Sequence, residues 1–160
     1  MTPSQNITCQ TVTWSVGDTP LDHGPCVAAI GNFDGVHRGH ATVIAAAIDA
    51  ARAKRVAAAA VTFDPHPREF FRHEDAPFHL ADRAEKDRLL AALGLDRVIH
   101  VTFDDNLRCT DASAFVSDVL PALGVTDLFA GSDFAFGRGR GGDLDTINAI
   151  GSGIGISASA

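Results

Sequence analysis

The sequence is short of the residue types that mark several large classes of protein. Its 160 residues include 13 lysines and arginines against 20 aspartates and glutamates, for a formal net charge of −7 and an isoelectric point near 5.3. A general nucleic-acid-binding protein needs a basic face. The charge balance argues against such a partner, although a local positive site for a small anion remains compatible with it.

Cysteines and long apolar runs are also scarce. Cys9, Cys26 and Cys109 are odd in number and lack C-x-x-C spacing, so they support neither a disulfide framework nor a zinc site, and we expect no bound metal. Nowhere do about 18 apolar residues follow one another, and the N-terminus lacks the basic start and apolar stretch of a signal peptide. We therefore expect a cytoplasmic protein with no membrane partner, and the oligomeric state stays open.

The sequence contains enough apolar residues for one core, since 46% of its residues are hydrophobic. After a polar lead-in over residues 1–24, short apolar segments alternate with segments of helical period. The predicted strands are 11–14 (a weak edge strand), 26–30, 55–63, 97–103 and 126–130. The predicted helices are 41–53, 81–93, 112–123 and 143–150. The alternation implies βαβ crossovers and hence an α/β, Rossmann-like, doubly wound parallel sheet of about five strands, with helices on both faces, spanning residues 25–160.

The inward faces of these helices can also be predicted from apolar spacing. The first helix should bury Val43, Ile44, Ala47, Ile48 and Ala51, the second Leu89, Leu90 and Leu93, and the third Phe115, Val116, Val119 and Leu120. Asp111 is a plausible N-cap of the third helix. Pro121 should shorten or bend that helix, because proline removes a backbone donor.

A glycine-bearing turn, Gly-Asn-Phe-Asp-Gly-Val-His-Arg-Gly-His at residues 31–40, joins the first buried strand to the first helix. Its glycines let the backbone approach a ligand closely, and the start of the helix offers unpaired N–H groups and a positive dipole end to an anion. If the helix begins here, His37 and His40 share one face and can reach the same phosphate. The ordinary alternative is a pair of exposed helix-start histidines, but the position directly after a buried strand favours phosphate binding.

The turn is not one of the two commonest phosphate-binding motifs. The P-loop pattern G-x-x-x-x-G-K-[ST] is absent from the chain, and G-x-G-x-x-G is absent from this stretch. The expected chemistry is instead nucleotide binding with stabilisation of charge at a phosphoryl group, which needs positioning more than covalent help.

Two further segments follow predicted strands, and ligands of parallel sheets bind at the carboxyl ends of strands. His66 lies between two prolines that hold it extended, and Arg140 belongs to a compact cationic loop suited to phosphate. Each has a plain alternative, a strand-ending turn and a solvated loop respectively. Asp133 is placed to orient a heterocycle or to cap a helix, whereas burial in the core is the simpler role for at least one of Phe134 and Phe136.

These three segments together resemble one known family. Residues 31–40 resemble the HxGH signature of the bacterial bifunctional riboflavin kinase/FMN adenylyltransferases, residues 63–67 (Phe-Asp-Pro-His-Pro) their F-x-P-H-P segment, and residues 131–143 their G-x-D-F-x-F-G-x-x-R-x-G-D segment. The first motif alone would indicate only the wider HxGH nucleotidylyltransferases. Three motifs in the family's order make the resemblance specific to the amino-terminal, adenylyl-transferring module.

The resemblance implies a transferase that moves AMP from ATP to FMN, giving FAD and pyrophosphate, with Mg²⁺ carried on ATP. Its implied catalytic residues are His37 and His40. The implied ATP-binding residues are Gly31, Asn32, Phe33, Asp34, His37, Gly39, His40 and Arg140. The implied flavin and nucleotide pocket consists of His66, Pro67, Asp133, Phe134 and Phe136.

The chain departs from the family pattern near its end. The family continues to an S-S-T-x-I-R segment whose serine and arginine contact ATP, whereas residues 155–160 read Gly-Ile-Ser-Ala-Ser-Ala. We therefore expect a module truncated at its C-terminus, without a riboflavin kinase domain, and with weakened turnover. A fragment that binds nucleotide and flavin without catalysis, and a different HxGH nucleotidylyltransferase, stay open as alternatives.

Overall fold

The computed structural model describes residues 9–33, 38–64, 83–131 and 134–160. Within them, six strands form one sheet in the order β1-β4-β3-β2-β5-β6, and all five neighbouring pairs are parallel. The strands are β1 (Gln10–Trp14), β2 (Cys26–Ile30), β3 (Ala57–Asp64), β4 (Arg97–Thr102), β5 (Val125–Phe129) and β6 (Ser157–Ser159).

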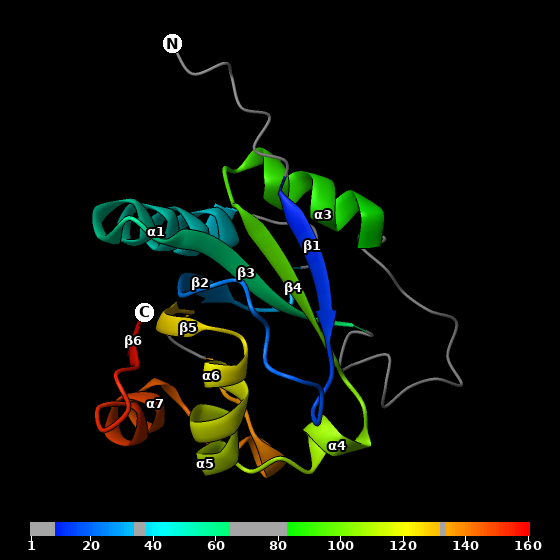
Figure 1. The fold of residues 1–160 in the computed structure, drawn as a ribbon, viewed down its shortest axis with the longest axis vertical. Helices are drawn as coiled ribbons and strands as arrows, with labels where there is room; N and C mark the ends of the chain where they lie inside the picture. Colours follow the sequence, from blue (N-terminus) through cyan, green and yellow to red (C-terminus); the bar gives the residue numbers. More distant parts are fainter. Residues whose placement is uncertain (1–8, 34–37, 65–82, 132–133) are drawn as a thin grey trace.

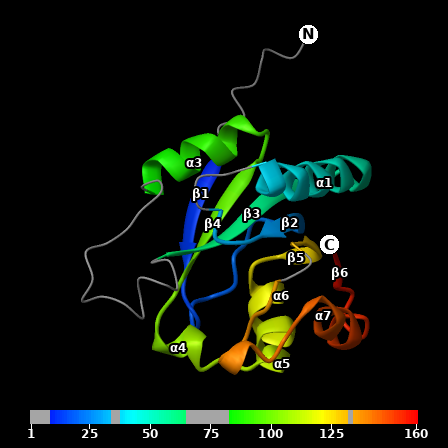
Figure 2. The same cartoon turned by 180° about the vertical axis from the view of Figure 1, so that it is seen from behind.

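Helices cover both faces of this sheet (Figure 1). On one face lie α1 (Arg38–Lys54) and α3 (Arg83–Ala92). On the other lie α5 (Ala112–Ala114), the π-helical turn η2 (Phe115–Val119), α6 (Leu120–Ala122) and α7 (Leu144–Gly151), as the view from behind also shows (Figure 2). Two short elements, α4 (Asp105–Arg108) and the 3₁₀ turn η3 (Arg138–Arg140), complete the described helices. The predicted doubly wound α/β fold is confirmed.

Burial on both faces explains the apolar character of the central strands. In β2, Cys26, Ala28 and Ile30 point into the cluster beneath α5–α7, while Val27 and Ala29 point into the cluster beneath α1. A strand covered on both sides reads as a continuous apolar run rather than an alternating one. The same holds for β3, whose residues from Ala58 to Thr62 are all buried.

Several helix predictions are confirmed in detail. Ile44, Ala47 and Ala51 of α1 are fully buried, with Val43 and Ile48 packed beside them. The carboxylate of Asp111 accepts a hydrogen bond from the Ala114 amide at 2.8 Å and so caps α5. Pro121 follows the π-helical turn η2 and lies in the short helix α6, so the predicted continuous helix is divided.

Other details differ from the sequence prediction. Leu93 is 38% exposed, because α3 ends at Ala92 and Gly94 turns the chain at φ +101°, which leaves Leu90 as its buried leucine. Strand β3 begins at Ala57, since Arg55 adopts φ +58° just after α1. Strand β6 was not predicted, because a polar three-residue segment carries little strand signal. Among the described residues no helix is long and apolar enough to cross a membrane.

Candidate functional site

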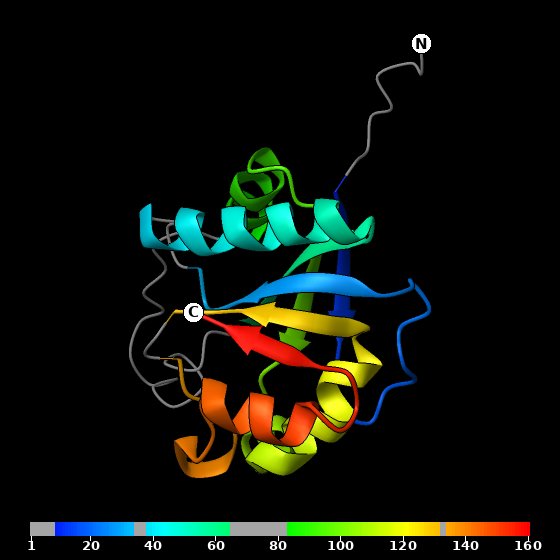
Figure 3. The ribbon, with the colours of Figure 1, turned by 90° about the vertical axis from the view of Figure 1, so that its left-hand side faces the viewer.

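The carboxyl end of β2, where the predicted site begins, lies where the winding of the sheet reverses. β2 pairs with β3 on one side and with β5 on the other, and the chain reaches β3 through α1 but passes from β5 to β6 through α7. Ligands of such sheets bind at this switch point, outside the carboxyl ends of the strands. Figure 3 shows the arrows of β2, β5 and β6 pointing toward the end of the molecule at which α1 begins.

Gly31 and Phe33 form the first part of the turn. The Gly31 amide donates to the Val61 carbonyl at 3.0 Å, which continues the ladder one residue past β2. A Cβ on Gly31 would lie 3.2 Å from the Phe33 ring, so the glycine makes room for that ring. Phe33 adopts φ +53° and its side chain is only 1% exposed. It therefore shapes the turn from inside the core rather than lining an open pocket.

His40 lies in the first turn of α1, next to the exposed Gly39. Its half-buried imidazole packs edge-on against the Phe33 ring, with centroids 5.3 Å apart and planes at 88°. This helix is 17 residues long, and the positive end of its dipole lies at the turn, which favours an anion there. Of the other predicted residues of this turn, Asp34 and His37 lie outside the described residues.

Asn32 connects the turn to β3 and α3. Its carbonyl accepts a hydrogen bond from the Thr62 hydroxyl at 3.1 Å and another from the Lys86 ammonium at 3.1 Å. Lys86 also donates to the Thr62 hydroxyl at 3.0 Å and is only 8% exposed. A buried ammonium group therefore lies directly behind the glycine-bearing turn.

Sequence reasoning missed both Thr62 and Lys86, although each leaves a signal. Thr62 is the polar residue within the apolar stretch of β3 that precedes Asp64. Lys86 stands one helical turn before Leu90, on the face that α3 buries. A charge on an apolar helix face is the kind of exception that marks a buried polar contact.

Further polar contacts join α3 to the sheet beside this group. His100 of β4 is fully buried, and its Nε2 lies 2.7 Å from an Asp87 carboxylate oxygen. Burial lowers the pKa of His100, against the opposing effect of Asp87. Arg83 donates to Asp64 at 2.8 Å and to the Thr13 hydroxyl at 2.7 Å. Hence hydrogen bonds from polar side chains make up much of the contact between α3 and the sheet.

The segment before α7 forms a second, compact group. Phe136 and Gly142 form an antiparallel bridge with hydrogen bonds of 2.9 and 3.0 Å, which closes the loop that carries Arg140. Gly142 is required because a Cβ there would lie 2.6 Å from the Phe136 ring. Phe136 is buried and stacks on the half-buried Phe134 with centroids 5.6 Å apart. Arg140 is exposed at φ +55°.

The structure thus places the predicted residues in two groups. It brings Gly31, Asn32, Phe33 and His40 together at the start of α1, and Phe134, Phe136 and Arg140 around the loop before α7. In Figure 3 the start of α1 and the loop before α7 lie toward the same end of the molecule. His66, Pro67 and Asp133 fall outside the described residues.

A donor-rich turn of this kind suits phosphate, and comparison with known proteins specifies the family. The model of the FAD synthetase family matches residues 19–160. The chain belongs to the FAD synthetase family. That confirms the resemblance derived from the three motifs, which all lie within the matched range.

The relatives of this chain carry names that correspond to this family. It is 42% identical over 140 residues to the bifunctional riboflavin kinase/FMN adenylyltransferase of Pseudomonas fluorescens, covering 87% of this chain and 45% of the relative. It is 40% identical over 127 residues to the protein of that name from Escherichia coli strain K12, covering 79% and 41%. Identity to a FAD synthetase of Listeria monocytogenes is 34% over 135 residues, covering 81% and 52%. The chain therefore spans about half or less of the length of these relatives.

A solved structure with the same fold is titled as a macrolide-efflux protein from Streptococcus pneumoniae. Its TM-score to this chain is 0.81, at 21% identity, with 95% of this chain and 58% of the other covered. At that identity the likeness shows the fold alone. It supports the doubly wound architecture over nearly the whole chain.

Proposed function

We propose that this chain is an FMN adenylyltransferase module, which transfers AMP from ATP to FMN and releases pyrophosphate. The observation that carries the proposal is the position of His40, held by Phe33 in the first turn of α1 at the carboxyl end of β2, in a chain of the FAD synthetase family. Such a turn offers imidazole and backbone N–H donors where phosphate oxygens would lie. The proposal covers adenylyl transfer and does not extend to riboflavin kinase activity.

In the proposed reaction, an oxygen of the FMN phosphate attacks the α-phosphorus of ATP. The bond from the α-phosphorus to the bridging oxygen breaks, and pyrophosphate leaves with that electron pair. His40, with His37 as its expected companion, would donate hydrogen bonds to phosphate oxygens as negative charge builds up there. Gly31, Asn32, Phe33, Asp34 and Gly39 would shape the ATP-binding turn.

The remaining predicted residues would complete the site. Arg140 would contact the phosphates, while His66, Pro67, Asp133, Phe134 and Phe136 would build the flavin and nucleotide pocket. Mg²⁺ would arrive on the triphosphate, which supplies most of its oxygen ligands. The described side chains nearest this turn include the ammonium group of Lys86 and no carboxylate that contacts Asn32, and a positive group there suits phosphate oxygens better than a protein-bound cation. With small soluble nucleotides as its partners, the module would act in the cytoplasm.

The direct test is FAD formation by the purified chain with FMN, ATP and Mg²⁺, followed by chromatography and by pyrophosphate release. His40→Ala should lower kcat by about 100-fold, the typical cost of removing one donor to a developing oxyanion. His23→Ala is the matched control, because His23 is exposed and precedes β2 at the opposite end of the strand. Its rate should equal that of the wild type.

Three outcomes would count against the proposal, and each points elsewhere. Binding of FMN and ATP without FAD formation would indicate a non-catalytic binding module. Adenylyl or cytidylyl transfer to an acceptor other than FMN, with no retention of flavin, would indicate another nucleotidylyltransferase. Equal rates for His40→Ala and the wild type would remove His40 from the mechanism.

A further inference from the structure

Lys86 occupies a position that packing alone does not explain. It reaches from α3 to the ends of β2 and β3, contacting Asn32, which is 54 positions away, and Thr62, which is 24 positions away. Its side chain is 92% shielded from solvent (8% exposed). Burial of an ammonium group is costly unless it is hydrogen-bonded, and a leucine or methionine would anchor the helix at less cost. The charge is therefore expected to serve a purpose beyond holding α3.

The contact with Asn32 acts on the backbone of the turn. The Asn32 carbonyl belongs to the peptide group that precedes Phe33, so the two hydrogen bonds from Lys86 and Thr62 set the orientation of that peptide. Phe33 then adopts φ +53°, a conformation that an aromatic residue keeps only when its surroundings hold it. Lys86 is one of the groups that hold it.

The orientation of the Phe33 ring in turn affects the position of the His40 imidazole. The Phe33 ring lies over Gly31 and against the edge of His40, so a shift of the Asn32 peptide would displace the surface on which the imidazole rests. A continuous path of contacts thus runs from Lys86 through Asn32 and Phe33 to His40. The positive charge of Lys86 also lies close behind a turn that is expected to bind an anion.

We propose that Lys86 is a positioning residue of the nucleotide site, whose ammonium group binds the Asn32 carbonyl and so holds Phe33 in the conformation that packs against His40. This rests on the proposed function, in which that turn binds the phosphates of ATP. Lys86 is not assigned contact with the substrate. It acts through the backbone of Asn32 and the ring of Phe33.

The test compares Lys86→Met with two control variants of α3. Lys86→Met keeps the length and packing of the side chain but removes the charge and the donors. Arg88→Met removes a charge from the solvent side of the same helix, where Arg88 is 71% exposed. Asp87→Ala breaks the contact between α3 and His100 and leaves the Asn32 contact intact. The second control separates loosening of the helix from loss of the clamp.

Loss of the Lys86 ammonium group should affect the use of ATP and leave the binding of FMN unchanged. Lys86→Met should lower kcat/KM for ATP by up to about 100-fold, the scale of a small misplacement of a catalytic group. FMN affinity, measured from flavin fluorescence, should stay unchanged. Thr62→Val should give a smaller loss in the same direction, and the double variant should lose less than the product of the two, because both groups act on one carbonyl. Both controls should retain the wild-type kcat/KM once corrected for the folded fraction.

A direct titration with ATP keeps this inference separate from the proposed function. If the wild type binds ATP but forms no FAD, the adenylyltransferase proposal fails, and the affinity of Lys86→Met for ATP decides the role of Lys86. A decrease of roughly tenfold, the worth of a hydrogen bond from a charged group, would support it. Equal affinity and equal kcat/KM for Lys86→Met and the wild type, or an equal loss in Asp87→Ala, would overturn it. Absence of ATP binding by the wild type would overturn both proposals.

Discussion

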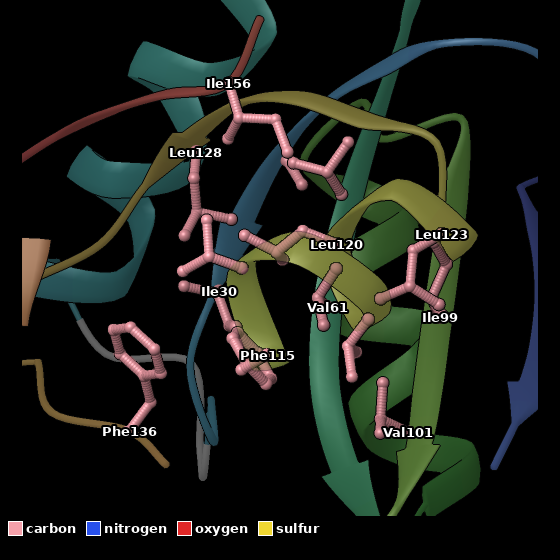
Figure 4. Packing of buried hydrophobic residues seen from close by; sticks show 14 of the residues in the cluster. Ile30, Val61, Ile99, Val101, Phe115, Leu120, Leu123, Leu128, Phe136 and Ile156 are labelled. Carbon is pink, nitrogen blue, oxygen red and sulfur yellow. The ribbon is translucent and has the colours of Figure 1, made fainter. Parts of the chain in front are cut away.

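The two faces of the sheet are built from different kinds of side chain. The face beneath α5–α7 is lined by one apolar cluster, in which Leu120 and Leu123 lie with residues of all six strands; Figure 4 shows part of this cluster. The face beneath α1 is also apolar, but under α3 the sheet residues Thr62 and His100 and the helix residue Lys86 are all buried and all in polar contacts. We expect the larger apolar cluster to contribute more of the stability, and we have proposed that the polar part of the other face orients the turn after β2.

The comparison predicts that damage on the apolar face is the most costly to stability. Leu120→Ala should lower the free energy of unfolding by about 2–5 kcal/mol, because Leu120 is fully buried and its neighbours can close the cavity only in part. Urea denaturation measures this. The variant should retain the wild-type kcat per folded molecule at low temperature, and a loss of kcat larger than the loss of folded protein would show that the faces are not separable.

Gly31→Ala should affect both stability and catalysis. Its methyl group would lie 3.2 Å from the Phe33 ring, so the ring must move, at a cost of about 1–3 kcal/mol typical of overpacking. The rate of FAD formation per folded molecule should also fall, since the Phe33 ring packs against His40. Gly153→Ala is the control, because a methyl there would meet nothing nearer than 3.9 Å. Equal activities of the two variants would refute the role given to Gly31.

Removal of a helix cap at the edge of the apolar face should cost less. Asp111→Ala removes the acceptor for the Ala114 amide and should lower the free energy of unfolding by about 1 kcal/mol. Asp111→Asn, which keeps an acceptor oxygen, should recover most of that loss. Thermal unfolding of the three proteins checks the order, and an Asn variant as unstable as the Ala variant would contradict the capping role.

The smallest effect concerns pH and the polar face. Burial lowers the pKa of His100 below its ordinary value of 6.5, so between the folded and unfolded pKa values the unfolded chain binds more protons. The free energy of unfolding then rises with pH in this window, and the stability is lost as the pH falls below about 6.5. His100→Asn should flatten the change in melting temperature between pH 7.5 and 5.5. An unchanged slope would mean that His100 does not titrate differently on folding.

The layered fold can be predicted from the sequence, because the spacing of apolar residues and the alternation of strands and helices reflect burial directly. They located α1 through Ile44, Ala47 and Ala51, and they predicted that Gly31 follows β2 and that His40 lies close to the start of that helix. They failed where a contact joins distant segments. The clamp of Lys86 on the Asn32 carbonyl leaves no local motif, and Leu93 lies outside the core only because α3 ends one residue earlier.

The central position of β2 has a consequence for how the chain folds. Its two neighbours are far apart in sequence, and the Thr126 hydroxyl bonds to the Cys26 carbonyl across 100 positions. During synthesis, β2 can pair with β3 early, but its other edge stays open until residues 125–129 have emerged. Pairings of such long range make folding slow and expose strand edges in the meantime. The strand that carries the nucleotide turn is thus among the first to be made and among the last to be enclosed.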